Sequence, residues 1–119
     1  MSELRIKRIY EEASAEDGYR ILVDRLWPRG ISKEKAHIDL WGKEISPSSE
    51  LRKWFHHEPE QFPEFRARYF EELQNNEEAA AFREMISDKL KAGNVTLLFS
   101  AKDEACNNAV VLRDWLMEE

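Results

Sequence analysis

Two apolar stretches of this sequence are each followed by polar and charged side chains that could bind an anion. Guanidinium groups bind carboxylate and phosphate oxygens through paired N–H donors, and the free backbone N–H groups at a helix N-terminus attract the same oxygens. The candidate ligand-binding residues that follow the two stretches are Asp24, Arg25, Trp27, Arg29, Lys102, Asp103 and Asn107. Lys43 and Arg52 lie between the stretches in the sequence and are further candidates.

The two apolar stretches, residues 19–23 and 95–99, predict the buried strands that must position these side chains. Pro28 and Gly30 follow the first stretch and turn the chain in a new direction. If the two strands are parallel, their carboxyl ends meet at one edge of the sheet, where ligands bind in open α/β folds. Trp27, Trp41 or Trp54 would then supply apolar walls, although tryptophans more often fill cores.

The rest of the chain predicts a small α/β fold in one domain spanning residues 1–119. We expect a short, largely parallel sheet of three or four strands packed with helices. The further elements that we expect are strands at 4–10 and 37–41 and helices at 48–55, 63–75 and 77–91, with a last helix capped by Asp103. Ser48 is the expected N-cap of the first of these helices, and the third has two glutamates, Glu77 and Glu78, in its first turn. The second helix has a core stripe of residues three or four apart: Phe62, Phe65, Tyr69 and Leu73. Strand order stays open, because residues 11–18 are a short link for a parallel crossover.

The net charge of −6 argues against generic binding to nucleic acid or to acidic lipids, both of which require many basic contacts. A small basic pocket remains compatible with that charge, because net charge averages over the whole surface. The sequence has no secretory h-region and no apolar run near the length of a transmembrane helix. We therefore expect a cytoplasmic protein whose partners include neither nucleic acid nor a membrane.

The single cysteine, Cys106, has no partner for an intramolecular disulfide, which fits a reducing compartment. We expect it in the first turn of the last helix, as a small buried apolar residue; a reactive thiol is the less favoured alternative. His56 and His57 point about 100° apart on a helix and are poorly placed to share an ion, so the sequence predicts no metal site. It also has no glycine-rich phosphate loop and no dinucleotide fingerprint, and we expect no cofactor.

Motifs along nearly the whole chain resemble those of the YeaO-like family, a bacterial domain of unknown function. The matching segments are 17–20, 24–30, 32–33, 47–48, 51–55, 95–98, 102–103, 107 and 109–112, together with Trp41, Lys43, Phe65 and Tyr69. The resemblance implies a small α/β domain with a largely parallel sheet, and it transfers no activity, cofactor or catalytic residue. A distant branch of the superfamily carries Cys-His-Arg at the start of the last helix, where this chain has Cys106-Asn107-Asn108. The missing arginine argues against a phosphatase of that kind.

Three functions remain to be weighed. The leading one is binding of a small anionic or phosphorylated ligand, with or without chemistry; Asp24 or Asp103 would be the general base of an enzyme. The alternative is a protein-interaction module with an exposed aromatic patch at Trp54, Phe55 and Phe62. A nucleic-acid-binding regulator is the least favoured. The sequence does not decide the ligand, catalysis or the oligomeric state.

Overall fold

The computed structural model describes residues 2–56 and 58–118, and its centre is a four-stranded sheet in the order β1-β4-β2-β3. The strands are β1 (Leu4–Arg8), β2 (Tyr19–Leu22), β3 (Leu40–Trp41) and β4 (Val95–Phe99). Every pairing is parallel. The expected α/β class is therefore confirmed, and the sheet is parallel throughout its described strands.

The strand order explains how a short link joins two parallel strands. β4 lies between β1 and β2, and Leu97 pairs with Ile6 on one side and with Ile21 on the other. All five residues of β4 are buried, as expected for a central strand that is covered on both faces. The chain returns from the end of β1 to the start of β2 through a loop that contains a 3₁₀ turn at Ala15–Asp17. A loop with one turn thus performs the crossover that more often uses a helix.

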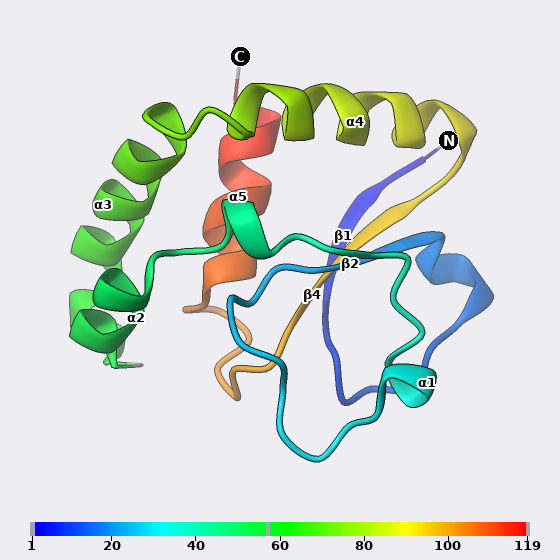
Figure 1. The fold of residues 1–119 in the computed structure, drawn as a ribbon, viewed down its shortest axis with the longest axis horizontal. Helices are drawn as coiled ribbons and strands as arrows, with labels where there is room; N and C mark the ends of the chain where they lie inside the picture. The colour runs from blue at the N-terminus through cyan, green and yellow to red at the C-terminus, as the bar shows by residue number, and fades with distance from the viewer. Residues whose placement is uncertain (1, 57, 119) are drawn as a thin grey trace.

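Four longer helices cover one face of this sheet (Figure 1). They are α2 (Ser49–Phe55), α3 (Phe62–Gln74), α4 (Ala79–Ala92) and α5 (Asn108–Met117). The short helix α1 (Lys33–Ala36) and the surrounding loops cover the other face. Alternation along the strands divides their side chains accordingly: Ile21 belongs to the helical core, whereas Leu22 packs with Ala36 on the α1 side.

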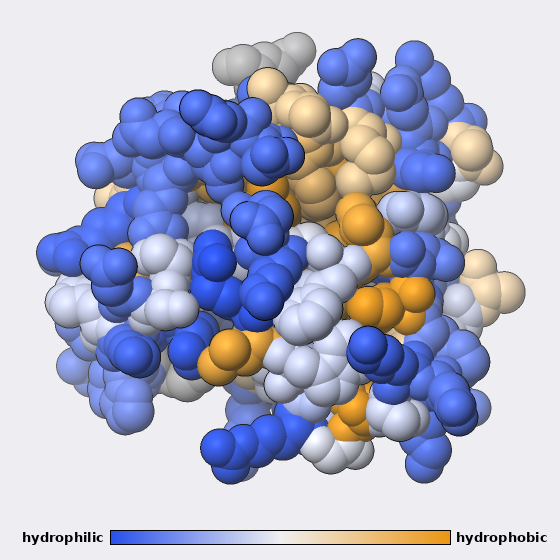
Figure 2. Space-filling model, viewed as in Figure 1, coloured by the Kyte–Doolittle hydropathy of each residue, from blue (hydrophilic) through white to orange (hydrophobic). Residues whose placement is uncertain are grey.

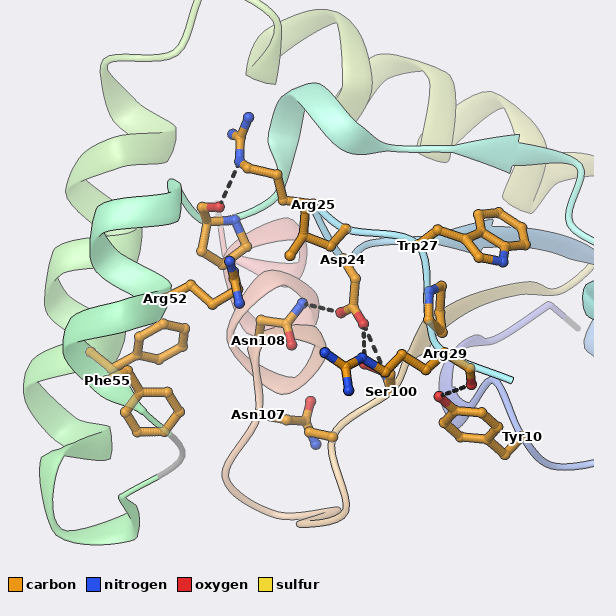
Figure 3. Close-up of a pocket in the computed structure, with 15 residues that line it drawn as sticks. Tyr10, Asp24, Arg25, Trp27, Arg29, Arg52, Phe55, Ser100, Asn107 and Asn108 are labelled. Atoms are coloured by element: carbon orange, nitrogen blue, oxygen red, sulfur yellow. Dashed lines mark hydrogen bonds between the residues drawn. The ribbon is translucent and has the colours of Figure 1, made fainter. Parts of the chain in front are cut away.

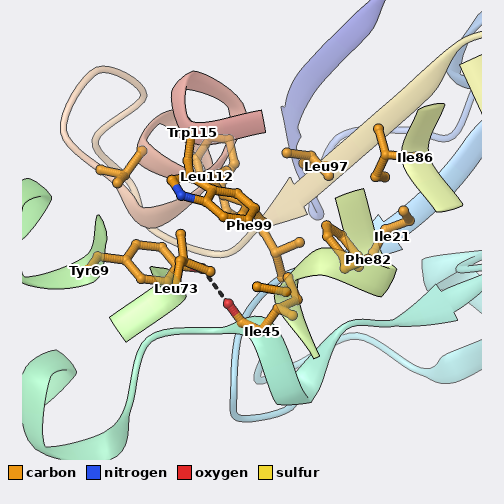
Figure 4. Close-up of a cluster of buried hydrophobic side chains, with 14 of the residues drawn as sticks. Ile21, Ile45, Tyr69, Leu73, Phe82, Ile86, Leu97, Phe99, Leu112 and Trp115 are labelled. Atoms are coloured by element: carbon orange, nitrogen blue, oxygen red, sulfur yellow. Dashed lines mark hydrogen bonds between the residues drawn. The ribbon is translucent and has the colours of Figure 1, made fainter. Parts of the chain in front are cut away.

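The main core lies between the sheet and the helical layer (Figure 4). The expected stripe on α3 is present: Phe65, Tyr69 and Leu73 are buried, and Phe62 is partly buried against the same core. The Tyr69 hydroxyl donates a hydrogen bond to the carbonyl of Ile45 at 2.6 Å, so its polar end is satisfied inside the core. The surface in Figure 2 is mostly hydrophilic, with paler apolar side chains gathered over the region of α4. None of the helices in the described residues is long and apolar enough to span a bilayer.

Two expectations about helix starts were wrong. The last helix is capped by Asn107, whose side chain accepts a hydrogen bond from the Val110 N–H at 3.0 Å, and not by Asp103. Asp103 instead accepts hydrogen bonds from the backbone of Ala105 and Cys106 within the preceding loop. Asp and Asn are both favourable N-cap residues. The buried residues of this helix begin at Ala109, so an earlier turn would add no side chain to its apolar face. The α4 helix likewise begins at Ala79, after the two glutamates that were expected in its first turn.

Candidate functional site

A cleft of about 370 Å³ lies at the carboxyl ends of β2 and β4 (Figure 3). The predicted residues that line it are Asp24, Arg25, Trp27, Arg29, Arg52 and Asn107. The other lining residues are Tyr10, Leu26, Pro28, Pro47, Phe55, Phe65, Ser100, Ala101 and Asn108. The structure thus brings together residues from both predicted strand ends and from α2. The volume is at the lower end of the range for small-molecule sites.

Asp24 ties the three elements at the base of the cleft together. Its Oδ2 atom accepts hydrogen bonds from the backbone N–H of Ser100, at 3.0 Å, and from the Ser100 hydroxyl. Its Oδ1 atom accepts a hydrogen bond from the Asn108 side chain at 3.0 Å. Both carboxylate oxygens are therefore occupied by neutral donors from the end of β4 and the start of α5. Such a carboxylate holds the cleft together and is poorly placed to accept a proton from a ligand.

Asn108 is a lining residue that the sequence analysis missed. Its Nδ2 atom donates to the carbonyl of Val23 at 2.7 Å as well as to Asp24, so the side chain links α5 to the end of β2. The pair Asn107-Asn108 was the available signal. One asparagine of such a pair caps the helix, and the other is then free to bond elsewhere.

Arg25 stabilises the turn that precedes α2. Its Nε atom donates to the carbonyl of Pro47 at 2.9 Å, and its Nη2 atom donates to the carbonyl of Ser46 at 3.1 Å. Two of its donor atoms are therefore already committed to backbone carbonyls. Arg25 was predicted to bind a ligand, but in this structure it mainly supports the loop beside the cleft.

Glu72 of α3 secures the start of α2. Its carboxylate accepts hydrogen bonds from the backbone N–H of Ser48, at 2.9 Å, and from the Ser48 hydroxyl. The same hydroxyl oxygen accepts a hydrogen bond from the Leu51 N–H at 3.1 Å, as expected for the N-cap that the sequence predicted. The helix that carries Arg52 is thus anchored at its first turn.

Arg52 lines the cleft without a partner. Its Nε atom is enclosed and makes no hydrogen bond, and its guanidinium forms no ion pair within the described residues. The Arg29 side chain also lines the cleft, is exposed, and forms no hydrogen bond or ion pair with the described residues. An enclosed donor without a partner is costly, so the Arg52 guanidinium gains most from an acceptor in the cleft.

Aromatic and apolar groups form the walls. Phe55 and Phe65 are stacked with ring centroids 4.2 Å apart, and both line the cleft. Trp27 donates its indole N–H to the carbonyl of Ile31 at 2.8 Å and packs edge-on against Trp41. Of the three tryptophans considered as walls, only Trp27 lines the cleft. Phe65 was missed as a lining residue because its spacing is typical of a core stripe, and Phe55 was considered only as part of an exposed aromatic patch.

Three predicted site residues, Lys43, Lys102 and Asp103, do not line the cleft. Lys43 lies over the ring of Trp41 at 5.3 Å, and the Lys102 side chain is exposed. Hydrogen bonds from the backbone of Cys106 and Ala105 lower the pKa of Asp103 below its usual value. A lowered pKa makes the carboxylate a weaker base, and the backbone of Ala105 and Cys106 already occupies its Oδ1 atom, which argues against a role as general base.

Cys106 precedes α5 instead of lying in its first turn, which corrects the sequence expectation. Burial raises the pKa of its thiol, and the negative charge of Asp103 raises it further. Both effects disfavour the nucleophilic thiolate. Within residues 2–56 and 58–118, no three His, Cys, Asp or Glu side chains are grouped so that they could hold a metal ion.

Comparison with known proteins places this architecture in a family. The family model described as "Inactive DUF488-N3 subclade" matches residues 3–119. "Uncharacterized protein YeaO" of Escherichia coli (strain K12) is 49% identical over 113 residues, covering 95% of this chain and 96% of that protein. "Uncharacterized protein Rv3073c" of Mycobacterium tuberculosis (strain ATCC 25618 / H37Rv) is 39% identical over 115 residues, covering 97% and 94%. No solved structure gives a significant match. The chain therefore belongs to the YeaO-like family, within the inactive DUF488-N3 subclade.

Proposed function

We propose that this protein binds a small anionic ligand in the cleft at the carboxyl ends of β2 and β4, without acting on it chemically. The observation that carries the proposal is the Arg52 guanidinium, which lines the cleft with an enclosed and unbonded Nε atom. The Nη atoms of the same guanidinium also form no hydrogen bond with the described residues and are not among their enclosed atoms, so a carboxylate or phosphate oxygen in the cleft would bind to them through charge-assisted hydrogen bonds. Arg29 at the cleft wall supplies a second positive charge.

The overall charge of the protein restricts where an anion can bind. A chain with a net charge of −6 repels anions on average, so affinity for an anion has to come from a local arrangement of cations. Asp24 is the only carboxylate among the residues that line the cleft. Because neutral donors occupy both of its oxygens, it leaves the two guanidinium groups free for an external anion.

Binding without catalysis is favoured by the state of the reactive groups. Asp24 has both oxygens occupied, the pKa of Asp103 is lowered, and that of the Cys106 thiol is raised. The family description contains the word "Inactive". These observations leave the described lining residues without an available base or an activated nucleophile.

The alternative function, a protein-interaction module, loses its main argument. Phe55 is buried, and Trp54 and Phe62 are partly buried, so none of the three forms the exposed aromatic patch that would mark such a surface. Trp54 is in addition covered by the guanidinium of Arg68, whose centre lies 4.3 Å from the ring centroid.

Isothermal titration calorimetry with inorganic phosphate, sulfate and benzoate tests the proposal. We expect at least one of these anions to bind to the wild type, and Arg52→Gln to weaken its binding about 10- to 100-fold, because a hydrogen bond to a charged group contributes about 1.5–3 kcal/mol. Arg29→Gln should weaken binding less, because the Arg29 side chain is exposed and its attraction is screened.

Arg113→Gln is the matched control for the loss of one positive charge. Arg113 lies on α5 outside the cleft and forms no side-chain hydrogen bond or ion pair with the described residues. Its replacement should leave anion binding unchanged. Equal weakening by Arg52→Gln and Arg113→Gln would indicate attraction to the general surface, and absence of binding by all three anions would reject the site.

A further inference from the structure

We infer that the ligand of this cleft is a small aromatic acid that also carries a hydroxyl or amino group, and that this group donates a hydrogen bond to the Oδ1 atom of Asn108. The inference rests on the proposed anion site and adds the chemical class of its ligand. It follows from a fixed acceptor at one position of the cleft, a free guanidinium at another, and an aromatic wall.

The orientation of the Asn108 side chain is fixed by its neighbours. The carbonyl oxygen of Val23 and the Oδ1 atom of Asp24 are both acceptors, and both lie within hydrogen-bond distance of one end of this side chain. Only the NH₂ group can face two acceptors, so the Oδ1 atom of Asn108 must point the other way. Rotation of the amide by 180° would set oxygen against oxygen at both contacts.

The Oδ1 atom of Asn108 is open to the cleft. It accepts no hydrogen bond from the described residues, and it is not among their enclosed atoms that lack a partner. Because Asn108 lines the cleft, this oxygen is presented to whatever occupies it (Figure 3). The negative charge of Asp24 behind the NH₂ group polarises the amide and strengthens the oxygen as an acceptor.

An acceptor and a guanidinium in one cleft select different groups of a ligand. An anion placed against Asn108 would face the carbonyl dipole and the charge of Asp24, whereas Arg52 from α2 offers only donors. A ligand that satisfies both must carry a negative group for Arg52 and an O–H or N–H donor for Asn108. Sulfate has no donor at neutral pH and meets only the first requirement, whereas hydrogen phosphate has both groups but no ring to fill the apolar part of the cleft.

The cleft suits one planar ring. Tyr10, which is 43% exposed, and the partly buried Trp27 line it with aromatic surface, whereas Phe55 and Phe65 are stacked on each other and almost fully buried. A cleft of about 370 Å³ is small for a drug-sized ligand and sufficient for a single substituted ring. An aromatic ring gains from offset stacking or edge contacts with the accessible rings of Tyr10 and Trp27.

The test compares benzoate with its three hydroxy and three methoxy derivatives in calorimetric titrations of the full chain. We expect one hydroxybenzoate isomer to bind about 3- to 10-fold more tightly than benzoate and than the methoxybenzoate of the same geometry, as one net hydrogen bond predicts. The methoxy group fills the same position without a donor, so size alone does not produce this preference.

Two variants test whether Asn108 is the acceptor that produces the preference for a hydroxybenzoate. Asn108→Ala should abolish the preference for the hydroxyl while keeping affinity for benzoate. Asn76→Ala is the matched control, because it also removes an asparagine amide that donates to a backbone carbonyl, but at a position outside the cleft. It should keep the preference. If Asn108→Ala does not fold, the comparison of hydroxy- and methoxybenzoates on the wild type still tests whether the cleft recognises a donor group of the ligand.

The outcomes separate this inference from the proposed function. If benzoate binds in a manner that depends on Arg52 and no hydroxy isomer binds more tightly, the inference is overturned and the anion site stands. If the preference survives in Asn108→Ala, another acceptor is responsible and the inference is likewise overturned. If no benzoate derivative binds at all and phosphate and sulfate also fail, the proposed function falls with it.

Discussion

The polar clusters at the two ends of β2 contain similar residues but differ in what they leave unpaired. Before the strand, Asp17 is bound by Lys7 at 3.1 Å and by the guanidinium of Arg20. The remaining donors of Arg20 reach the carbonyls of His37 at 3.0 Å and Ala36 at 2.8 Å. The side chains of Asp17 and Arg20 are only 1% and 5% exposed, and each charge has a partner.

After the strand, the aspartate and the arginines do not pair with one another. Asp24 is bound by the neutral side chains of Ser100 and Asn108, and Arg52 lines the cleft without a partner among the described residues. A buried charge that is fully paired fixes the geometry of the fold, because removing one partner leaves the other uncompensated. An unpaired cation beside a cleft contributes little to the fold and is available to a ligand. The same residue types therefore serve structure at one end of β2 and, as we propose, binding at the other.

Replacing Arg20 should have the largest effect on stability. Arg20→Gln removes the main partner of a buried carboxylate and two hydrogen bonds to backbone carbonyls. We expect the free energy of unfolding to fall by about 3–5 kcal/mol, measured by urea denaturation. Arg68→Gln, which breaks an exposed ion pair with Glu64, should change it by less than about 1 kcal/mol. Similar losses in the two variants would contradict the structural role of the buried cluster.

Acid should weaken the same cluster. Burial on its own would raise the pKa of Asp17, but hydrogen bonds from Ser14, Lys7 and Arg20 outweigh it and hold the pKa below its usual value. A carboxyl whose pKa is lowered by folding stabilises the protein above its unfolded pKa of about 3.9. That contribution is lost as the pH falls through the folded value.

Urea denaturation of the wild type and Asp17→Asn between pH 7 and pH 3 measures this contribution. The difference in unfolding free energy between the two proteins should be constant from about pH 7 to pH 5 and should shrink below about pH 4. A difference that stays constant down to pH 3 would show that another group controls acid stability.

Removing Asp24 should cost less than breaking the buried cluster. Asp24→Ala leaves the Ser100 N–H, the Ser100 hydroxyl and one Asn108 N–H without their acceptor, but no buried cation loses its partner. We expect a loss of about 1–3 kcal/mol in unfolding free energy. A loss as large as that of Arg20→Gln would mean that Asp24 compensates a charge, which would weaken the contrast between the two clusters.

Local sequence patterns predicted the elements of this fold better than the functional site. The stretch 95–99 is apolar at nearly every position, and as the central strand β4 it is covered by the helical layer on one face and by the α1 side on the other. The N-cap at Ser48 was also predicted, because capping depends on residues three positions apart. The start of the last helix was predicted wrongly, since Asp103 and Asn107 are both acceptable caps and sequence alone does not choose between them.

The partners of the arginines could not be predicted, because they come from distant parts of the chain. Arg25 binds carbonyls of residues 46 and 47, and Asp24 binds Ser100 and Asn108. The sequence therefore favoured Arg25 as a leading ligand-binding residue and Arg52 only as a further candidate. Only the folded chain shows that the first is committed to backbone carbonyls and the second is free.

Arg52→Gln should have the smallest effect on stability. The structure has a useful comparison in Arg83, the other described residue whose enclosed Nε atom lacks a partner. Arg83 is otherwise engaged, because its Nη2 atom donates to the carbonyl of Trp115 at 2.7 Å and its guanidinium lies over that ring at 3.9 Å. Arg83→Gln should therefore lower the free energy of unfolding by about 1–2 kcal/mol.

Arg52 makes no such contacts, and its replacement should change the free energy of unfolding in ligand-free buffer by less than about 0.5 kcal/mol. Urea denaturation of both variants measures the difference. With a bound anion present, the wild type should gain stability by mass action and Arg52→Gln should not. A large loss for Arg52→Gln without any ligand would show that its guanidinium supports the fold. The polar clusters at the two ends of β2 would then differ in geometry, but both would serve to stabilise the fold.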